Sequence, residues 1–342
     1  MSAGTTSTGP VEQAGRTEPE VALAVAGLSV RIDTAAGPVL AVDDVGFSAP
    51  SGETLALLGE SGCGKSITAQ AVAGLLDPVA RVVGGEVRLG DVEMLGLTPS
   101  ERRKLAGPEL AIVFQDALTA LNPVYTVGTQ LAEPFRIHRG LSARQARERA
   151  LDLMRRVGIP EPESRIDHHP HQFSGGMRQR LLIAMAVALG PKVLIADEPT
   201  TALDVTVQAQ IMELLRDLRA EHSMAVVLIT HDLALVAEQA DRVAVMYAGR
   251  VVETGLVREV FREPLHPYTR GLLESVPAAG RGDRLPSIPG APPDLHSIPE
   301  GCVYQARCPM VQDICRTQRP APEAVGEGRT SACHFSKELR HG

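Results

Sequence analysis

A short apolar segment at residues 54–58 leads directly into the sequence G-E-S-G-C-G-K-S at residues 59–66, and a pattern of helical spacing follows at 65–76. The eight residues fit the pattern G-x-x-x-x-G-K-S/T, whose glycines let the backbone wrap a phosphate group at the positive end of the following helix. We expect Lys65 to reach the β- and γ-phosphates of a nucleotide and the Ser66 hydroxyl to bind Mg²⁺. A strand before the loop and a helix after it are the context this pattern requires, so a glycine-rich turn without chemistry is disfavoured.

Beyond this loop, strands and helices alternate, which predicts a wound α/β core with a parallel sheet. The predicted strands are 193–197, 225–230 and 242–247, and the predicted helices are 178–189, 205–221 and 232–239. An antiparallel β region is expected at 21–32, 39–47 and 82–89, and a short buried strand at 110–114. Residues 116–178 are predicted to form a helical subdomain, in which Ser142 and Gln145 form a capping box and a helix stops at Gly158.

Composition limits where the chain works and what it binds. No charge-free apolar run of about 18 residues exists, so no transmembrane helix is expected. The N-terminus has no signal peptide pattern, and residues 1–20 are predicted to be a disordered polar tail. The net charge of −7 argues against a basic nucleic-acid-binding surface. We therefore expect a cytoplasmic protein, with any membrane role exercised through partners.

Two acids follow the apolar strand predicted at 193–197. Asp197 closes the strand and Glu198 comes next. A buried strand beside the phosphate loop would place Asp197 near Mg²⁺ and Glu198 near the attacking water, as a general base. The two acids could also merely begin a loop, but the phosphate loop favours the catalytic interpretation.

The sequence F-S-G-G-M-R-Q-R at residues 173–180 resembles the signature of the ABC ATPase family, with Met177 where many members carry Gln. In that family the signature caps the γ-phosphate of ATP held by a second subunit, so the resemblance implies a head-to-tail dimer. Gln115 resembles the residue that touches Mg²⁺ and senses the membrane partner, Asp204 lies in a loop that couples the two sites, and His231 resembles the switch histidine. The resemblance covers about residues 21–275. The catalytic pair is expected to be Glu198 and His231, and Mg²⁺ is expected to bind Ser66, Gln115 and Asp197. The residues expected to contact ATP are Gly59, Ser61, Gly62, Cys63, Gly64, Lys65, Ser66, Ile67, Gln115, Ser174, Gly175, Gly176 and Asp204.

Within the family, several stretches resemble the dipeptide/oligopeptide importer branch, namely residues 115–123, 171–180, 196–206 and 266–269 and the cysteine-containing end. The resemblance implies ATP-driven peptide import from the cytoplasmic face of the membrane, as a peripheral subunit. The implied partners are a second ATPase subunit, two transmembrane permease subunits and an extracytoplasmic substrate-binding protein. Import of nickel or another small solute stays open as an alternative. A DNA-repair or translation-factor ABC protein is disfavoured, because the chain has neither a long coiled-coil insertion nor a second cassette.

One departure from the family concerns the nucleotide base. The family usually stacks adenine on an aromatic residue ahead of the phosphate loop, whereas residues 1–46 contain no aromatic side chain. Ile32 or a residue of 34–39 is expected to take that place, which predicts weaker discrimination between ATP and GTP.

Residues 276–342 are expected to form a separate module on a Pro-rich linker, because prolines and four of the five cysteines gather there. Zinc modules favour C-x2–4-C pairs, which are absent, and four thiolates of looser spacing suit a [4Fe–4S] cluster. Zinc, or cysteines that are unligated or paired in disulfides, are the alternatives. A ligated metal would then hold this small module folded. The predicted cluster ligands are Cys302, Cys308, Cys315 and Cys333.

Overall fold

The computed structural model describes residues 20–115, 120–201, 203–275 and 287–340. Residues 1–19 of the predicted disordered tail and residues 276–286, at the start of the predicted Pro-rich linker, fall outside these residues. Within the described ranges no helix combines the length and the apolar character needed to cross a membrane.

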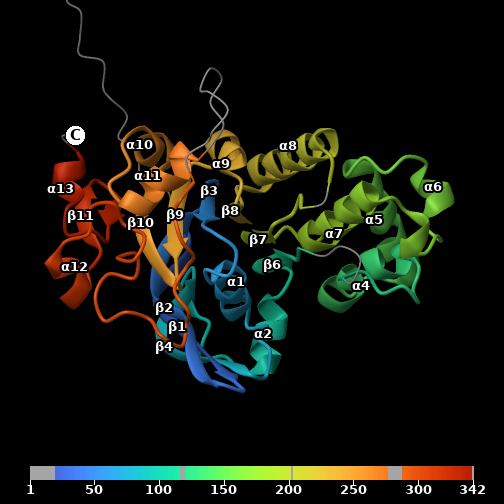
Figure 1. The fold of residues 1–342 in the computed structure, drawn as a ribbon. Helices are drawn as coiled ribbons and strands as arrows, with labels where there is room; N and C mark the ends of the chain where they lie inside the picture. Colours follow the sequence, from blue (N-terminus) through green and yellow to red (C-terminus); the bar gives the residue numbers. More distant parts are fainter. Residues whose placement is uncertain (1–19, 116–119, 202, 276–286, 341–342) are drawn as a thin grey trace, which may run out of the picture.

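The central feature is an eight-stranded sheet with the order β11-β12-β10-β9-β3-β8-β7-β6 (Figure 1). Five neighbouring strands are parallel to one another, which confirms the predicted α/β core. They are β9 (Arg242–Tyr247), β3 (Thr54–Leu58), β8 (Ala225–Thr230), β7 (Val193–Asp197) and β6 (Leu110–Val113). Strands β3, β7 and β8 are buried at every residue. A strand covered on both faces needs apolar side chains on both, so these segments are continuous apolar runs.

Helices cover both faces of this sheet. On one face α1 (Lys65–Ala73) packs between the main sheet and a second sheet, around Leu55, Leu57 and Val72. On the other, α7 (Gly175–Val187), α8 (Val205–His222) and α9 (Leu233–Gln239) pack on alternate residues of the same strands. Helix α7 begins at Gly175, three residues before the predicted start, because Ser174 caps it by accepting a hydrogen bond from the Met177 amide.

The second sheet is antiparallel, as predicted, with the order β2-β1-β4-β5. Its strands are β2 (Gly37–Pro50), β1 (Val21–Thr34), β4 (Ala80–Leu89) and β5 (Val92–Glu93). After it comes α2 (Pro99–Leu105), a helix that the apolar pattern did not predict. The sequence feature that indicates this helix is the capping box formed by Thr98 and Glu101 at its start.

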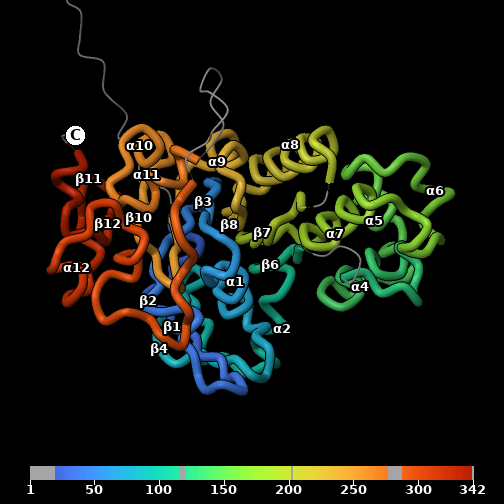
Figure 2. Tube along the Cα trace, viewed as in Figure 1, coloured from blue at the N-terminus to red at the C-terminus, as the bar shows by residue number. Residues whose placement is uncertain are grey.

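The predicted helical subdomain lies to one side of the main sheet, joined to it through β6 and α7 (Figures 1 and 2). It contains α4 (Val127–Arg139), α5 (Ala143–Arg156), α6 (Pro162–Arg165) and the 3₁₀ turn Pro170–Gln172. The predicted capping box is present, since Ser142 and Gln145 bond each other's backbone amides. Leu131, Met154 and Leu181 are among the side chains of its own apolar core.

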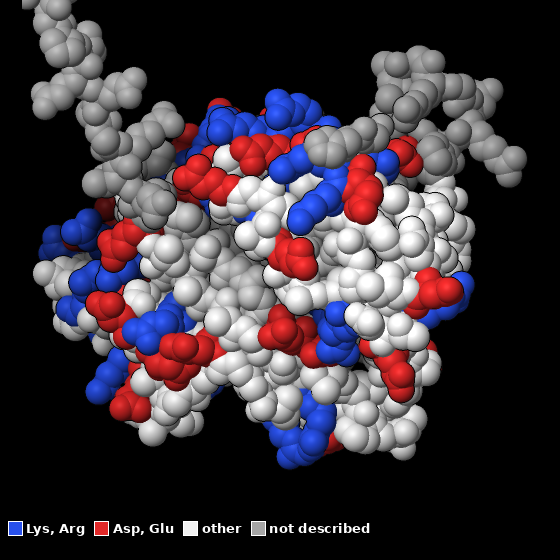
Figure 3. Space-filling model, turned by 90° about the vertical axis from the view of Figure 1, so that its left-hand side faces the viewer, with Lys and Arg blue, Asp and Glu red and all other residues white. Residues whose placement is uncertain are grey.

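The C-terminal part is not the separate module that the composition suggested. Strand β12 (Arg329–Ser331) pairs with β10 (Arg250–Leu256), and β11 (Glu323–Gly326) pairs with β12, so this region extends the main sheet. Its apolar residues, including Cys302 and Cys315, are buried in one cluster with residues of β9. The remaining elements are α10 (Val257–Arg262), α11 (Pro267–Glu274), α12 (Asp313–Thr317) and α13 (Ser336–Leu339). On the face shown in Figure 3, acidic and basic side chains are interspersed around a largely uncharged area.

Candidate functional site

The phosphate loop lies between β3 and α1, as predicted. Lys65 is buried, and its Nζ donates hydrogen bonds to the carbonyl oxygens of Gly59 at 2.7 Å and Glu60 at 3.0 Å. The ammonium group is thus held by the loop itself, with the loop curled around it. Gly62 and Gly64 have φ values of +79° and +103°, and such left-handed values favour glycine. The curled backbone and the N-terminus of α1 together form an anion site.

Close packing explains the first glycine of the loop. A Cβ atom at Gly59 would lie 2.3 Å from the carbonyl oxygen of Met246 in β9, a contact that only a backbone shift could relieve. At Gly64 a Cβ would lie 2.7 Å from the Ala41 carbonyl oxygen of β2. Both glycines therefore let neighbouring strands approach the loop.

Asp197 ends β7 directly beside the loop. Its Oδ1 accepts a hydrogen bond from Ser66 Oγ at 3.1 Å. Burial raises the pKa of this carboxyl and the charge of Glu198 adds to the increase, while the Ser66 hydrogen bond and Lys65 act against it. A buried carboxylate and a hydroxyl in contact are ligands that Mg²⁺ prefers, and a bound cation would reverse the pKa shift. These two residues fit the predicted magnesium site.

Glu198 is the centre of a hydrogen-bond network. Its Oε2 accepts from Gln115 Nε2 and from Thr201 Oγ1, each at 2.8 Å, and its Oε1 lies 3.0 Å from His231 Nδ1. Burial raises its pKa, but the hydrogen bonds from His231 and Thr201 and the nearby positive charges outweigh burial and lower the pKa overall. The carboxylate is therefore charged at neutral pH, as a general base must be.

The backbone at Glu198 is strained. Its φ is +45°, a left-handed value rare outside glycine, and its N–H donates to the Ile229 carbonyl oxygen of β8 at 2.9 Å. Such strain persists only where the surroundings hold it, and it is common at functional sites. The Glu198 side chain bonds Gln115 and His231, which follow β6 and β8, the two strands on either side of β7.

The signature residues are not part of this network. Ser174 caps α7, and a Cβ at Gly176 would lie 2.7 Å from Val207 Cγ1 of α8, so this glycine permits close helix packing. Asp204 caps α8 by accepting from the Val207 amide at 3.0 Å. Among the described residues, no hydrogen bond joins Ser174 or Asp204 to the phosphate loop. Their predicted contact with ATP stays a prediction.

The four C-terminal cysteines lie in one region of the structure. Burial, and the other three thiols after it, raise the pKa of Cys333 to about 12, and burial with Cys315 and Cys308 raises that of Cys302 to about 11. Nowhere in the described chain are three or more His, Cys, Asp or Glu side chains arranged to hold a metal ion. As they lie here, the cysteines do not fit a [4Fe–4S] cluster, and the structure does not support that prediction.

Sequence reasoning missed two groups of residues at this site. Thr201 Oγ1 donates a hydrogen bond to Glu198. The only feature of the sequence that pointed to this contact is that Thr201 lies three residues after Glu198. Glu60, inside the phosphate loop, is bonded by Tyr268 and by Arg307 from the far end of the chain. No local pattern connects residues so far apart in the sequence.

Comparisons with known proteins agree with the geometry. Residues 42–201 match the ABC transporter family, and residues 252–315 match the oligopeptide/dipeptide transporter C-terminal region. The chain is 49% identical to the dipeptide transport ATP-binding protein DppD of Escherichia coli (strain K12), covering 90% of this chain and 94% of that protein. It is 52% identical to a putative peptide import ATP-binding protein of Brucella abortus (strain 2308), covering 91% and 94%.

Among solved structures, the dimeric post-hydrolysis state of the ATP-binding cassette MJ0796 with ADP and phosphate is similar to this chain. Its TM-score is 0.62 and its identity 28%, and the match covers 69% of this chain and 99% of that cassette. The match supports the ATPase fold, and a second dimeric structure of the same cassette is equally similar.

Proposed function

The chain belongs to the ABC transporter family, among its ATP-binding subunits, and we propose that it hydrolyses ATP to drive import of dipeptides or oligopeptides across the cytoplasmic membrane. The peptide cargo is supported by relatives that are about half identical over nine-tenths of the chain and are named for dipeptide transport or peptide import. The match of residues 252–315 to the oligopeptide/dipeptide transporter C-terminal region supports it further.

The observation that carries the ATPase proposal is the charged Glu198 carboxylate beside the phosphate loop. His231, Gln115 and Thr201 hold its two oxygens, so its orientation is set before any nucleotide binds. Glu198 would accept a proton from water as the water oxygen bonds to the γ-phosphorus. The bond to the β–γ bridging oxygen breaks, and ADP leaves with that oxygen while phosphate is released.

Lys65 and a cation would balance the phosphate charge. Lys65 would exchange its bonds to the Gly59 and Glu60 carbonyls for bonds to phosphate oxygens. Ser66, Asp197 and Gln115 would hold Mg²⁺; because Gln115 directs its amide nitrogen to Glu198, its amide oxygen is the atom left for the cation. Bound Mg²⁺ neutralises charge on the β- and γ-phosphates.

The working unit in this proposal is a head-to-tail dimer. Ser174, Gly175 and Gly176 open α7, whose N-terminal amides favour an anion, and within the described chain they bond no phosphate-loop residue. A second ATPase subunit would bring its own phosphate loop to them, and Asp204 would lie between the two sites. The dimeric state of the similar cassette supports this arrangement. Two transmembrane permease subunits and an extracytoplasmic binding protein complete the proposed importer, with this subunit at the cytoplasmic face.

Uptake of a labelled dipeptide tests the proposal. Cells that depend on this protein would be compared with cells carrying Lys65→Ala, and with Lys192→Ala as the control, because Lys192 is an exposed lysine away from the loop. We expect uptake to be lost only in Lys65→Ala at equal expression. Uptake that is unchanged in Lys65→Ala would contradict the peptide cargo and direct the search to nickel or another small solute.

We also propose, as a separate point, that Cys302, Cys308, Cys315 and Cys333 take up a [4Fe–4S] cluster after their side chains rearrange. What supports it is that Cys302, Cys315 and Cys308 belong to one apolar cluster, in which the Cys302 amide donates a hydrogen bond to the Cys315 carbonyl oxygen at 2.8 Å. Iron and acid-labile sulfide would be measured in anaerobically purified protein. Finding neither would refute the cluster and leave the ATPase proposal intact.

A further inference from the structure

Three of the four tyrosines in this chain pack together behind the phosphate loop. The ring centroids of Tyr247 and Tyr268 are 4.6 Å apart, and Tyr304 lies 5.1 Å from Tyr247 and 5.4 Å from Tyr268. They come from β9, from α11 and from the C-terminal segment, which we define as residues 287–340. Tyr268 Oη accepts a hydrogen bond from the Glu60 amide at 3.0 Å, so this aromatic cluster contacts the loop directly.

Arg307 of the C-terminal segment makes the second contact with the loop. Its Nη1 and Nη2 donate to the two carboxylate oxygens of Glu60 at 2.7 Å and 3.0 Å. The Arg307 side chain is only 5% exposed, and its guanidinium lies 5.7 Å from the Tyr247 ring centroid. Its Nε donates to the Pro289 carbonyl oxygen at 2.9 Å. Paired charge-assisted bonds of this kind fix direction as well as distance, and burial protects them from screening.

Every polar group of Glu60 is thereby engaged. Its amide bonds Tyr268, its carbonyl oxygen accepts from Lys65, and its carboxylate bonds Arg307. Glu60 is the second residue of the phosphate loop, and Lys65 is the residue expected to bind the phosphates. Within the described chain, the hydrogen bonds of the C-terminal segment to the phosphate loop therefore run through Glu60, which touches both Arg307 and Lys65.

We propose that Arg307 is a positioning residue for nucleotide binding: by holding Glu60, it keeps the phosphate loop curled before the nucleotide arrives. This inference rests on the proposed ATPase function. A loop that is already ordered loses less conformational freedom on binding, so preorganisation raises affinity. Arg307 does not approach Glu198 or His231 by any bond within the described chain, so its effect falls on binding and spares the chemical step.

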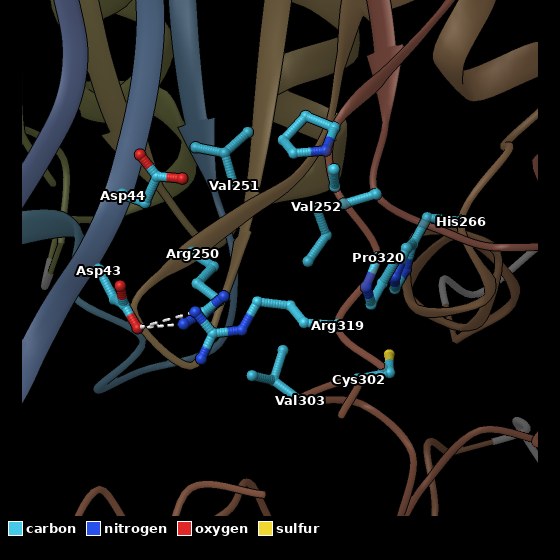
Figure 4. A pocket seen from close by; sticks show the side chains of 13 residues that line it. Asp43, Asp44, Arg250, Val251, Val252, His266, Cys302, Val303, Arg319 and Pro320 are labelled. Atoms are coloured by element: carbon cyan, nitrogen blue, oxygen red, sulfur yellow. Dashed lines mark hydrogen bonds and ion pairs between the residues drawn. The ribbon is translucent and has the colours of Figure 1, made fainter. Parts of the chain in front are cut away.

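A matched control comes from the same segment. Arg319 lies 3.9 Å from Asp43, a carboxylate that Arg250 already pairs with, at the edge of a cavity of about 170 Å³ (Figure 4). Arg319 is half-exposed and bonds no phosphate-loop residue within the described chain. Arg319→Gln removes one positive charge from the C-terminal segment, as Arg307→Gln does, but leaves the contact with Glu60 intact. Comparing the two variants therefore separates a general effect of charge on nucleotide affinity from the effect of the Glu60 contact.

The experiment measures ATP and ADP dissociation constants by calorimetry and steady-state ATPase kinetics for Arg307→Gln, Arg307→Lys and Arg319→Gln. For Arg307→Gln we expect both dissociation constants and the KM for ATP to rise about tenfold, with kcat within about twofold, as loss of one charge-assisted contact predicts. Arg307→Lys should recover part of the affinity, since it keeps the charge and loses the paired geometry. Arg319→Gln should match the wild type.

The single variant Glu60→Gln and the double variant Glu60→Gln/Arg307→Gln complete a double-mutant cycle, which separates the Glu60–Arg307 contact from a general folding defect. If Arg307 acts through Glu60, the double variant binds ATP no more weakly than either single variant. Additive losses, unchanged affinity in folded Arg307→Gln, or a fall in kcat at constant KM would each overturn the inference. A wild-type protein that bound no ATP would overturn the proposed ATPase function and this inference with it.

Discussion

The ion pair between Glu253 and Arg329 joins the C-terminal segment to the core of the ATPase domain. Glu253 in β10 is fully buried, and the Arg329 side chain in β12 is 3% exposed; Arg329 Nη2 donates to Glu253 Oε1 at 2.9 Å. The carboxylate also accepts from the amides of Leu265 at 2.9 Å and His266 at 3.1 Å. Removing the arginine would leave a buried carboxylate with no charged partner within its hydrogen-bonding reach.

For Arg329→Met we expect a loss of about 3–5 kcal/mol in the free energy of unfolding, the usual effect of breaking a buried pair. At about 2–4 °C per kcal/mol for a domain of this size, Tm falls by about 6–20 °C. Glu253→Gln/Arg329→Met should regain much of this, because no buried charge is left alone. The Arg340–Glu263 pair supplies the control: it is exposed, its atoms lie 4.0 Å apart, and Arg340→Met should change stability by less than about 0.5 kcal/mol.

Thermal unfolding followed by circular dichroism measures all three variants. Since β12 pairs with β10 in the main sheet, the lower stability of Arg329→Met should appear as a lower temperature of the main unfolding transition. If Arg329→Met unfolds at the same temperature as Arg340→Met, the reasoning about the buried pair is wrong. If it lowers only a small, separate transition, the C-terminal segment folds as an independent unit after all.

Four further outcomes are expected. Glu198→Gln should lower kcat at least about 100-fold and trap an ATP-loaded dimer on gel filtration; dissociation at the wild-type rate would contradict this. Thr201→Ala removes one hydrogen bond to Glu198 and should lower kcat by about 2- to 10-fold at unchanged ATP affinity; an altered affinity with normal kcat would argue against that role. Burial lowers the pKa of His266 from 6.5 to about 3, so below pH 6.5 only the unfolded state takes up its proton. Stability should then fall by about 1.4 kcal/mol per pH unit toward pH 3, and His266→Asn should lack this slope in denaturant titrations; equal slopes would refute it. Glu253 affects the pH dependence of stability with the opposite sign, because its raised pKa makes stability decrease as pH rises. Since Glu253 is present in both the wild type and His266→Asn, its effect cancels in the comparison of their slopes. Because residues 1–46 contain no aromatic side chain to stack on the base, ATP should be preferred over GTP by less than about tenfold; a stronger preference in competition binding would show that another group reads the base.

The parts of the fold that could be predicted are those set by local pattern. Strands β3, β7 and β8 are buried on both faces, and continuous apolar runs such as 193–197 reveal this directly. The phosphate loop needs glycines at fixed positions, because a Cβ at Gly59 or Gly64 would collide with neighbouring backbone. Gln115, Glu198 and His231 each follow a parallel strand, and such strand ends meet at one edge of the sheet.

The contacts of the C-terminal segment could not be predicted, for a physical reason. Strand β12 has three residues and carries Arg329 into the core, so it shows neither the length nor the apolar alternation of a strand. Its burial depends on Glu253, far away in the sequence, and the same is true of Arg307 and Glu60. In the sequence, the polar residues and prolines of the C-terminal segment show no periodicity, so they favoured the prediction of a separate module held by a metal. In the structure, the charges of Arg307 and Arg329 are instead buried in ion pairs with Glu60 and Glu253 of the ATPase core.

The position of β3 in the sheet has a consequence for synthesis on the ribosome. Strand β3 ends at residue 58, but its two hydrogen-bonded neighbours, β8 and β9, begin at residues 225 and 242. At translation rates of about 5 to 20 residues per second, roughly 8 to 33 s pass between the emergence of β3 and that of its first neighbour. For that time a largely apolar strand has two unpaired edges, which invites pairing with other chains. The nascent chain should therefore need a chaperone until residue 247 has emerged, and ribosome-bound fragments that end before β8 should be the most prone to aggregate.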